Sequence, residues 1–146
     1  MRIYLDNCSL QRFLDDQTQL RIRVETEALF AILTAVRDGR IDLLNSEALE
    51  FEIRKIQDIM RYKEAAAMLA FSSEYLKITV ENEMLAEILE QYGIRPMDAV
   101  HLAVATVAQA DYFITCDDKL LHKSTVVKDR ICKVISLPGF VSEELT

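Results

Sequence analysis

The chain has 146 residues, of which 51% are hydrophobic, the size of one ordinary domain whose core needs neither disulfides nor a structural metal. The 17 basic and 24 acidic residues give a formal net charge of -7, the wrong sign for a domain held to nucleic acid mainly by counterion release. An enzyme needs only a local basic rim, and two groups of basic residues can supply one: Arg54, Lys55, Arg61 and Lys63, and Lys119, Lys123, Lys128 and Arg130.

The three cysteines, Cys8, Cys116 and Cys132, are widely spaced and include no C-x-x-C pair. This spacing argues against a disulfide framework and against a thiolate zinc site. No stretch approaches the roughly 18 uninterrupted apolar residues of a membrane span, and the N-terminus lacks the pattern of a signal peptide. We therefore expect a soluble cytoplasmic protein with reduced thiols and no membrane partner.

Patterns typical of strands and of helices alternate along the chain. Residues 2–6 (RIYLD) are prone to form a strand, and residues 20–38 repeat apolar side chains at helical spacing until Gly39 ends the helix. Ser46 is placed to cap a helix that continues through Ile59. The other predicted elements are strands at 40–46, 75–80, 112–115 and 133–137, helices at 62–72, 83–92, 96–110 and 117–124, and a turn at Pro138 and Gly139 before a polar tail.

Strands that alternate with helices indicate one parallel sheet covered by helices on both faces, and residues 1–146 are expected to form a single domain of this α/β class. Ligands of such sheets bind outside the carboxyl ends of the strands. Asp6 ends the first strand and Asp117 lies two residues past the fourth. Asp98 and Glu52, in the first and second turns of their helices, face the same edge. The sequence therefore predicts that these four acids converge.

Converging carboxylates repel, and each one that ionises raises the pKa of the others unless a cation neutralises them. Oxygen ligands in a chain with only 2 histidines suit a hard ion such as magnesium or manganese. Such an ion can activate a water and stabilise the charge that develops on a phosphodiester. The pattern predicts hydrolytic nuclease chemistry.

Each acid also has a structural explanation when it is taken alone. Asp6 and Asp117 are placed to cap short helices, Asp98 gains from the dipole of its helix, and Glu52 is one of several acids on an exposed helix. The nearly all-apolar segment MDAVHLAVATVAQA, however, gives Asp98 little structural reason to be there. The placement of all four acids at one sheet edge favours a shared site.

Two further side chains are ambiguous. His101 follows Asp98 by three residues and can reach a metal from there, but a buried, hydrogen-bonded histidine is the favoured interpretation. Cys8 lies at a helix N-terminus, where a thiolate is stabilised, and is interpreted as a small packed residue because no histidine partner is evident. With only 3 glycines, the chain has none of the common phosphate-binding loops.

Four segments of the chain, in this order, resemble the PIN-domain ribonucleases over nearly the whole length. IYLDNC is similar to the family's opening strand with its first acid, Asp6. SEALEFE resembles the second element, where an acid follows a serine by six residues, and this points to Glu52. RPMDAVHLAVA and ADYFITCDDKLL are similar to the segments that supply the third and fourth acids, here Asp98 and Asp117, with Asp118 as an alternate.

The resemblance implies a three-layer α/β/α fold with a parallel sheet of about five strands in the order 3-2-1-4-5. It also implies a magnesium- or manganese-dependent endoribonuclease for single-stranded RNA, with four catalytic acids, of which Asp6, Asp98 and Asp117 bind the metal. Many relatives are VapC-type toxins that pair with an antitoxin and usually dimerise. The chain departs from the family at Asn7, where a hydroxyl residue is common, and at Cys8, where a small polar residue is frequent.

A catalytically weak or inactive PIN-like module that binds RNA or a protein partner is the alternative function, and the presence of all four acids argues against it. Two classes of phosphotransfer domain are excluded, each by a single residue. A haloacid-type phosphatase needs an aspartate at Cys8, and a receiver domain needs one at the end of the third strand, which reads LKITV. The AAAMLAF stretch at residues 65–71 predicts a partly exposed hydrophobic helix face and with it a homodimer.

Overall fold

A computed structural model describes all residues from Met1 to Thr146. Five strands form one sheet in which every pairing is parallel, in the order β3-β2-β1-β4-β5. The α/β class predicted from the alternating pattern and the strand order implied by the family resemblance are both confirmed. The strands are β1 (Arg2–Leu5), β2 (Asp42–Ser46), β3 (Glu74–Leu76), β4 (Tyr112–Thr115) and β5 (Lys133–Ser136).

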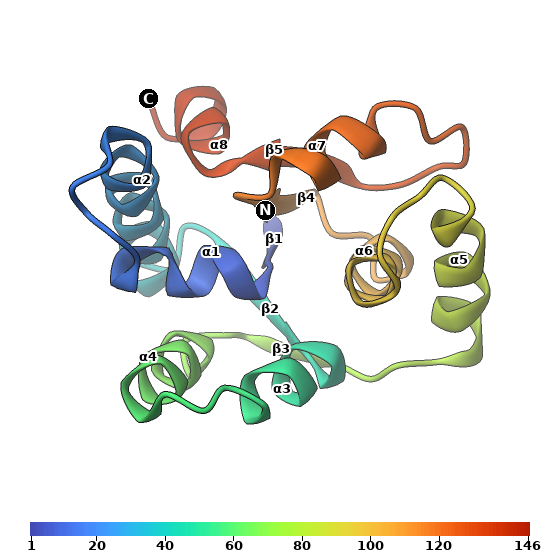
Figure 1. The fold of residues 1–146 in the computed structure, drawn as a ribbon, viewed down its shortest axis with the longest axis horizontal. Helices are drawn as coiled ribbons and strands as arrows, with labels where there is room; N and C mark the ends of the chain where they lie inside the picture. Colours follow the sequence, from blue (N-terminus) through green and yellow to red (C-terminus); the bar gives the residue numbers. More distant parts are fainter.

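Helices cover both faces of the sheet: α1, α2 and α4 lie on one side and α5 and α6 on the other (Figure 1). None of the helices combines the length and the apolar character that crossing a membrane would require. The helices are α1 (Asn7–Gln11), the short 3-10 helix η1 (Arg12–Leu14), α2 (Leu20–Arg37), α3 (Glu47–Arg54), α4 (Ile59–Leu69), α5 (Val80–Glu90), α6 (Pro96–Val107), α7 (Asp118–Ser124) and α8 (Leu137–Glu144).

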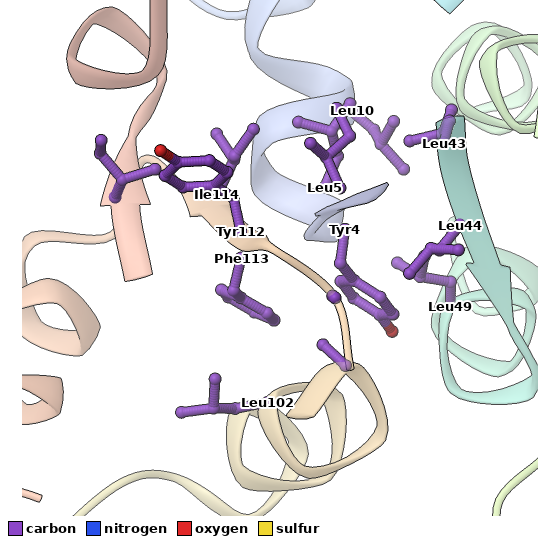
Figure 2. Packing of buried hydrophobic residues seen from close by; sticks show 14 of the residues in the cluster. Tyr4, Leu5, Leu10, Leu43, Leu44, Leu49, Leu102, Tyr112, Phe113 and Ile114 are labelled. Atoms are coloured by element: carbon purple, nitrogen blue, oxygen red, sulfur yellow. The ribbon is translucent and has the colours of Figure 1, made fainter. Parts of the chain in front are cut away.

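The core lies on both faces of the central strands β1 and β4. Tyr4 and Phe113 point toward α6, where their rings stack with centroids 5.4 Å apart, and Leu5 points the opposite way toward α1 (Figure 2). All three side chains are fully buried. A parallel strand that is covered on both faces needs apolar residues at successive positions, and this is why these strands lack a polar side.

Most strands pass directly into a helix at their carboxyl ends, and a side chain at each junction caps that helix. The cap of α1 is Asp6, that of α3 is Ser46, that of α7 is Asp117 and that of α8 is Ser136. Each of these side chains accepts a hydrogen bond from a backbone N–H in the first turn of its helix. Capping therefore brings polar side chains to the same edge of the sheet.

Two predicted boundaries in the middle of the chain are wrong. The helix expected to run from Ser46 through Ile59 ends at Arg54, and α4 begins at Ile59 because Asp58 caps it, its carboxylate accepting a bond from a backbone N–H 3.1 Å away. The third strand is only three residues long instead of reaching Val80. Thr79 forms a capping box with the third residue of α5, so Val80 already belongs to that helix.

The predicted turn at Pro138 and Gly139 is also wrong, because both residues lie in α8. Proline is tolerated in the first turn of a helix, where its missing N–H has no partner to lose. Ser136 Oγ accepts a hydrogen bond from the backbone N–H of Gly139 at 3.0 Å and caps this helix. The predicted stop after the long helix α2 is confirmed, since Gly39 has φ +76° at the position where helices commonly end.

Candidate active site at the carboxyl edge of the sheet

A cavity of about 430 Å³ lies at the carboxyl edge of the sheet, and all four acids singled out in the sequence line it. Asp6 and Asp117 come from the ends of β1 and β4, Glu52 from α3 and Asp98 from the first turn of α6. The structure thus brings the four predicted positions to one place. The other charged side chains of the cavity are Asp15, Arg12, Arg61 and Arg95.

Asp6 is the most deeply buried of the four acids, with 5% of its surface exposed. Its Oδ1 atom accepts hydrogen bonds from the backbone N–H of Ser9 at 3.1 Å and from the Cys8 thiol at 3.2 Å. Burial raises the pKa of Asp6, and hydrogen bonds from Thr115, Ser9 and Cys8 oppose the rise without cancelling it. Asp6 is therefore a carboxylate for which a nearby cation would be favourable.

Asp98 and Asp117 converge on the guanidinium of Arg95. Arg95 Nε lies 3.2 Å from Asp98 Oδ2, and Arg95 Nη2 lies 2.8 Å from Asp117 Oδ2. Burial raises the pKa of Asp98, and the charge of Arg95 opposes that rise. The Arg95 side chain is 70% exposed, whereas the two carboxylates are mostly covered. A largely exposed guanidinium thus provides the positive charge between two mostly covered carboxylates.

Glu52 is held by a chain of buried hydrogen bonds. His101, which is 1% exposed, contacts Glu52 Oε1 through Nε2 and the Tyr4 hydroxyl through Nδ1, the latter at 2.5 Å. The Tyr4 oxygen also lies 2.7 Å from Ser46 Oγ. Burial raises the pKa of Tyr4, so its hydroxyl stays protonated and has one hydrogen bond to donate, either to His101 Nδ1 or to Ser46 Oγ. The buried, hydrogen-bonded interpretation of His101 is confirmed.

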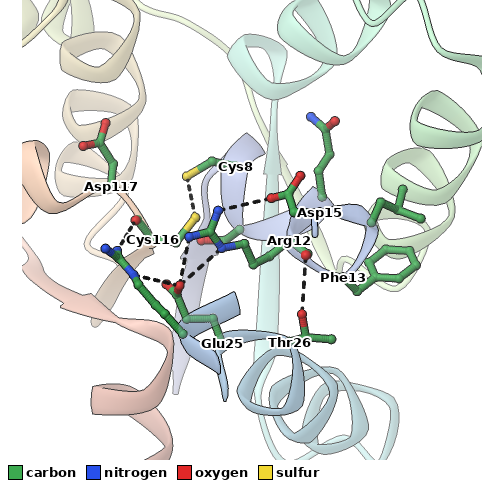
Figure 3. A network of polar contacts seen from close by, with 12 residues as sticks. Cys8, Arg12, Phe13, Asp15, Glu25, Thr26, Cys116 and Asp117 are labelled. Carbon is green, nitrogen blue, oxygen red and sulfur yellow. Dashed lines mark hydrogen bonds and ion pairs between the residues drawn. The ribbon is translucent and has the colours of Figure 1, made fainter. Parts of the chain in front are cut away.

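Asp118, the alternate fourth acid, lies outside this cavity. Its carboxylate pairs with Arg21, with Nη1 and Oδ2 2.6 Å apart, and its side chain is 69% exposed. Arg21 also contacts Glu25, which is buried between Arg21 and Arg12 (Figure 3). This network joins η1 and α2 to the segment that carries Asp117.

The sequence analysis missed three features of the site. Arg95 lies three residues before Asp98, a spacing at which two side chains on a helix can form an ion pair. The sequence therefore contained a signal for this contact. Arg61 was named only as one candidate for a basic rim, and its position on the cavity wall beside Asp15 was not predicted. The contact between Cys8 and Cys116, whose sulfur atoms are 3.1 Å apart, had no sequence signal because it depends on the pairing of β1 with β4.

The donor set of the cavity suits a hard divalent cation, since its acids offer only carboxylate oxygens. Its charged side chains comprise five carboxylates and three guanidiniums, an excess of two negative charges. As the side chains stand, no three histidine, cysteine or acidic groups form an arrangement that could hold a metal ion. Asp98 and Asp117 are instead paired with Arg95, whose guanidinium supplies the positive charge between them.

No family model and no curated protein matches this chain in sequence. Among solved structures, the chain is similar to a chain in the crystal structure of VapBC2 from Rickettsia felis bound to a DNA fragment from their promoter. The match has a TM-score of 0.59 and 10% sequence identity, and it covers 93% of this chain and 98% of that chain. At this identity the likeness concerns the fold alone. The fold is PIN-like, as the resemblance implied.

Replacing Tyr4 by phenylalanine should lower the free energy of unfolding by about 1–3 kcal/mol, because it leaves His101 Nδ1 and Ser46 without their buried partner. Tyr75→Phe is the matched control. That hydroxyl is exposed and bonds Glu50 at 3.1 Å, so its loss should change stability by less than about 0.5 kcal/mol. Urea unfolding measures both values, and equal losses in the two variants would contradict the buried network.

Proposed function

We propose that this protein is a divalent-metal-dependent endoribonuclease that hydrolyses phosphodiester bonds in single-stranded RNA. The observation that carries the proposal is the set of four acids around one cavity at the carboxyl edge of a PIN-like sheet. This edge is where parallel α/β sheets bind their ligands. A phosphodiester is an anion, and a cavity with an excess of negative charge can accept it only together with a cation.

Asp6, Asp98 and Asp117 are the proposed ligands of a magnesium or manganese ion. When bound, the ion would supply positive charge against the phosphate and lower the pKa of a water. The convergence of Asp98 and Asp117 on Arg95 supports this assignment, because both carboxylates already face a positive charge. The Arg95 side chain is largely exposed, so it can turn away from the two carboxylates when a metal ion binds between them.

The remaining polar side chains of the cavity have roles that need no metal. Glu52 is the proposed proton acceptor for the attacking water, and the hydrogen bond from His101 fixes its orientation. Arg61 is 31% exposed and bonds Asp15 at 2.9 Å on the α1 side of the cavity. We assign to Arg61 the contact with an RNA phosphate, which a guanidinium binds through paired N–H groups.

A toxin of a type II toxin-antitoxin pair is the proposed biological setting, with the cytoplasm as its location. One solved structure with a similar fold is that of VapBC2 from Rickettsia felis bound to a DNA fragment from their promoter. By analogy, an antitoxin protein is the proposed inhibitory partner.

A non-catalytic PIN-like module that binds RNA or a protein is the second candidate. One observation favours it: Arg95 already neutralises two of the four acids without a metal. Metal binding separates the two candidates, because the module has no need for an ion and the nuclease cannot work without one.

The variants Asp6→Asn and Asp117→Asn should remain folded and lose ribonuclease activity by about 100-fold or more, the scale of a lost electrostatic contact to a transition state. Asparagine can still cap both helices, so the loss would reflect the charge. Asp118→Asn is the matched control, one residue away and outside the cavity. The activity of each variant is measured as the rate of cleavage of a fluorescent single-stranded RNA in the presence of manganese. EDTA should abolish the cleavage by the wild type. Unchanged cleavage by Asp6→Asn would overturn the site.

Manganese should raise the melting temperature of the wild type, because a bound ion relieves the repulsion among the acids and stabilises the folded state. Asp98→Asn should reduce this gain while leaving the metal-free protein at least as stable as the wild type. Arg95→Gln should increase the gain, because manganese no longer competes with the guanidinium. If Asp98 is only a first-turn acid, Asp98→Asn should instead lose up to about 1 kcal/mol and keep the full manganese response.

A homodimer is also proposed, because the segment at residues 65–71 exposes part of an apolar face. Ala65, Met68 and Leu69 are buried, but Phe71 is 55% exposed, and Phe30 on α2 is 47% exposed. Phe30 and Phe71 line the same groove. Light scattering should show a dimer at about 10–100 µM, where a modest interface persists, and Phe71→Ser should shift it toward monomer. Monomer alone in the wild type would remove the proposal.

A further inference from the structure

Two cysteine thiols meet in the cavity. Cys8 lies in the first turn of α1 and Cys116 directly follows β4, and both line the cavity. Their sulfur atoms are 3.1 Å apart, and Figure 3 shows them facing each other. A disulfide bond is about 2.05 Å long, so the sulfurs need to approach by only about 1 Å to form one.

The backbone on both sides of this contact is fixed by the sheet. β1 and β4 are hydrogen-bonded neighbours, and beyond the last strand residue the N–H of Asp6 still donates to the carbonyl of Ile114 at 3.2 Å. On the other side, Arg21 Nη2 donates to the carbonyl of Cys116 at 3.1 Å. The approach of the two thiols is therefore imposed by the pairing of adjacent strands.

We propose that Cys8 and Cys116 form an oxidation-sensitive dithiol site that hydrogen peroxide converts to a disulfide. Cys8 is the more exposed of the two and reacts first. Its deprotonated sulfur attacks one peroxide oxygen, the O–O bond breaks, and the departing hydroxide takes up the proton that the thiol released, which gives a sulfenic acid and one water. Cys116 sulfur then attacks the sulfenic sulfur, the S–O bond breaks, and the second water leaves with the Cys116 proton. Two electrons pass from the sulfurs to the peroxide.

The geometry of the contact favours the second step. The two sulfur atoms already lie 3.1 Å apart at the cavity wall. Once the sulfenic acid forms, its partner is already in contact, so closure is intramolecular. Cys132 lies elsewhere, against Thr106.

The disulfide would alter the candidate active site, and this step rests on the proposed function. The Cys8 thiol donates a hydrogen bond to Asp6 Oδ1 at 3.2 Å, and oxidation removes that donor. Cys116 immediately precedes Asp117, so the new bond also restrains the second metal ligand. The oxidised protein should bind manganese more weakly than the reduced protein.

The test exposes the reduced wild type to hydrogen peroxide, blocks the remaining thiols with iodoacetamide and maps the peptides by mass spectrometry. We expect a linked Cys8–Cys116 peptide that is lost after dithiothreitol, at least about tenfold more abundant than any link to Cys132. Cys132→Ser, the matched control, should link equally well. Cys116→Ser should retain a sulfenic acid on Cys8 that dimedone labels. Free Cys8 and Cys116 after peroxide, or links mainly to Cys132, would overturn the dithiol site.

Manganese-dependent melting of the same samples tests the second step. Oxidised wild type should lose most of its manganese-induced rise in melting temperature and regain it with dithiothreitol, while oxidised Cys8→Ser should keep the rise. A linked protein with its full manganese response would overturn the effect on the site. If the reduced protein itself shows no manganese response, the proposed function fails, and the linked peptide still decides whether the dithiol site exists.

Discussion

The gathering of acidic side chains at one edge of a parallel sheet is the constraint on which this site depends, because carboxylates that lie close together repel one another. Asp6, Asp98 and Asp117 are all partly or fully buried there, and burial raises the pKa of the first two. Arg95 offsets part of the repulsion, and the hydrogen bond from His101 holds Glu52 to one side. Capping accounts for Asp6 and Asp117 but not for Asp98 and Glu52, which lie within their helices and face the same cavity.

The fold provides this gathering through ordinary capping. The end of each central strand is followed by a side chain that caps the next helix, so Asp6 and Asp117 are placed by the helices α1 and α7 before any ligand binds. Structural and functional explanations of these acids are therefore compatible. The caps fix where the carboxylates lie, and the strand register fixes which of them are neighbours. The same register brings two thiols into contact beside them.

Local patterns in the sequence were sufficient for most elements and for the α/β class, whereas the strand order followed from the family resemblance. The strand at residues 112–115 and the stop at Gly39 follow from β-propensity and from a helix-ending glycine. The errors arose where a capping side chain started a helix unexpectedly, as Asp58, Thr79 and Ser136 do. In a polar stretch of sequence, a residue that caps a helix cannot be distinguished from an ordinary loop residue.

The site was only partly accessible to the same reasoning. Topology was enough to bring the four acids together, because carboxyl ends of parallel strands share an edge. The contact between Cys8 and Cys116 depends on packing between segments 108 residues apart, and the ion pair of Arg95 with Asp117 joins residues 22 apart. No spacing rule within one segment reports such contacts. The role of the acids in catalysis stays a prediction.

Anomalous diffraction at the manganese absorption edge, from crystals soaked in manganese, tests the central claim most directly. Our account predicts one dominant peak within coordination distance of Asp6, Asp98 and Asp117, about 2.0–2.3 Å for a hard divalent ion, with Arg95 turned away from the two aspartates. A map in which Arg95 keeps both ion pairs and no manganese lies among these acids would contradict it.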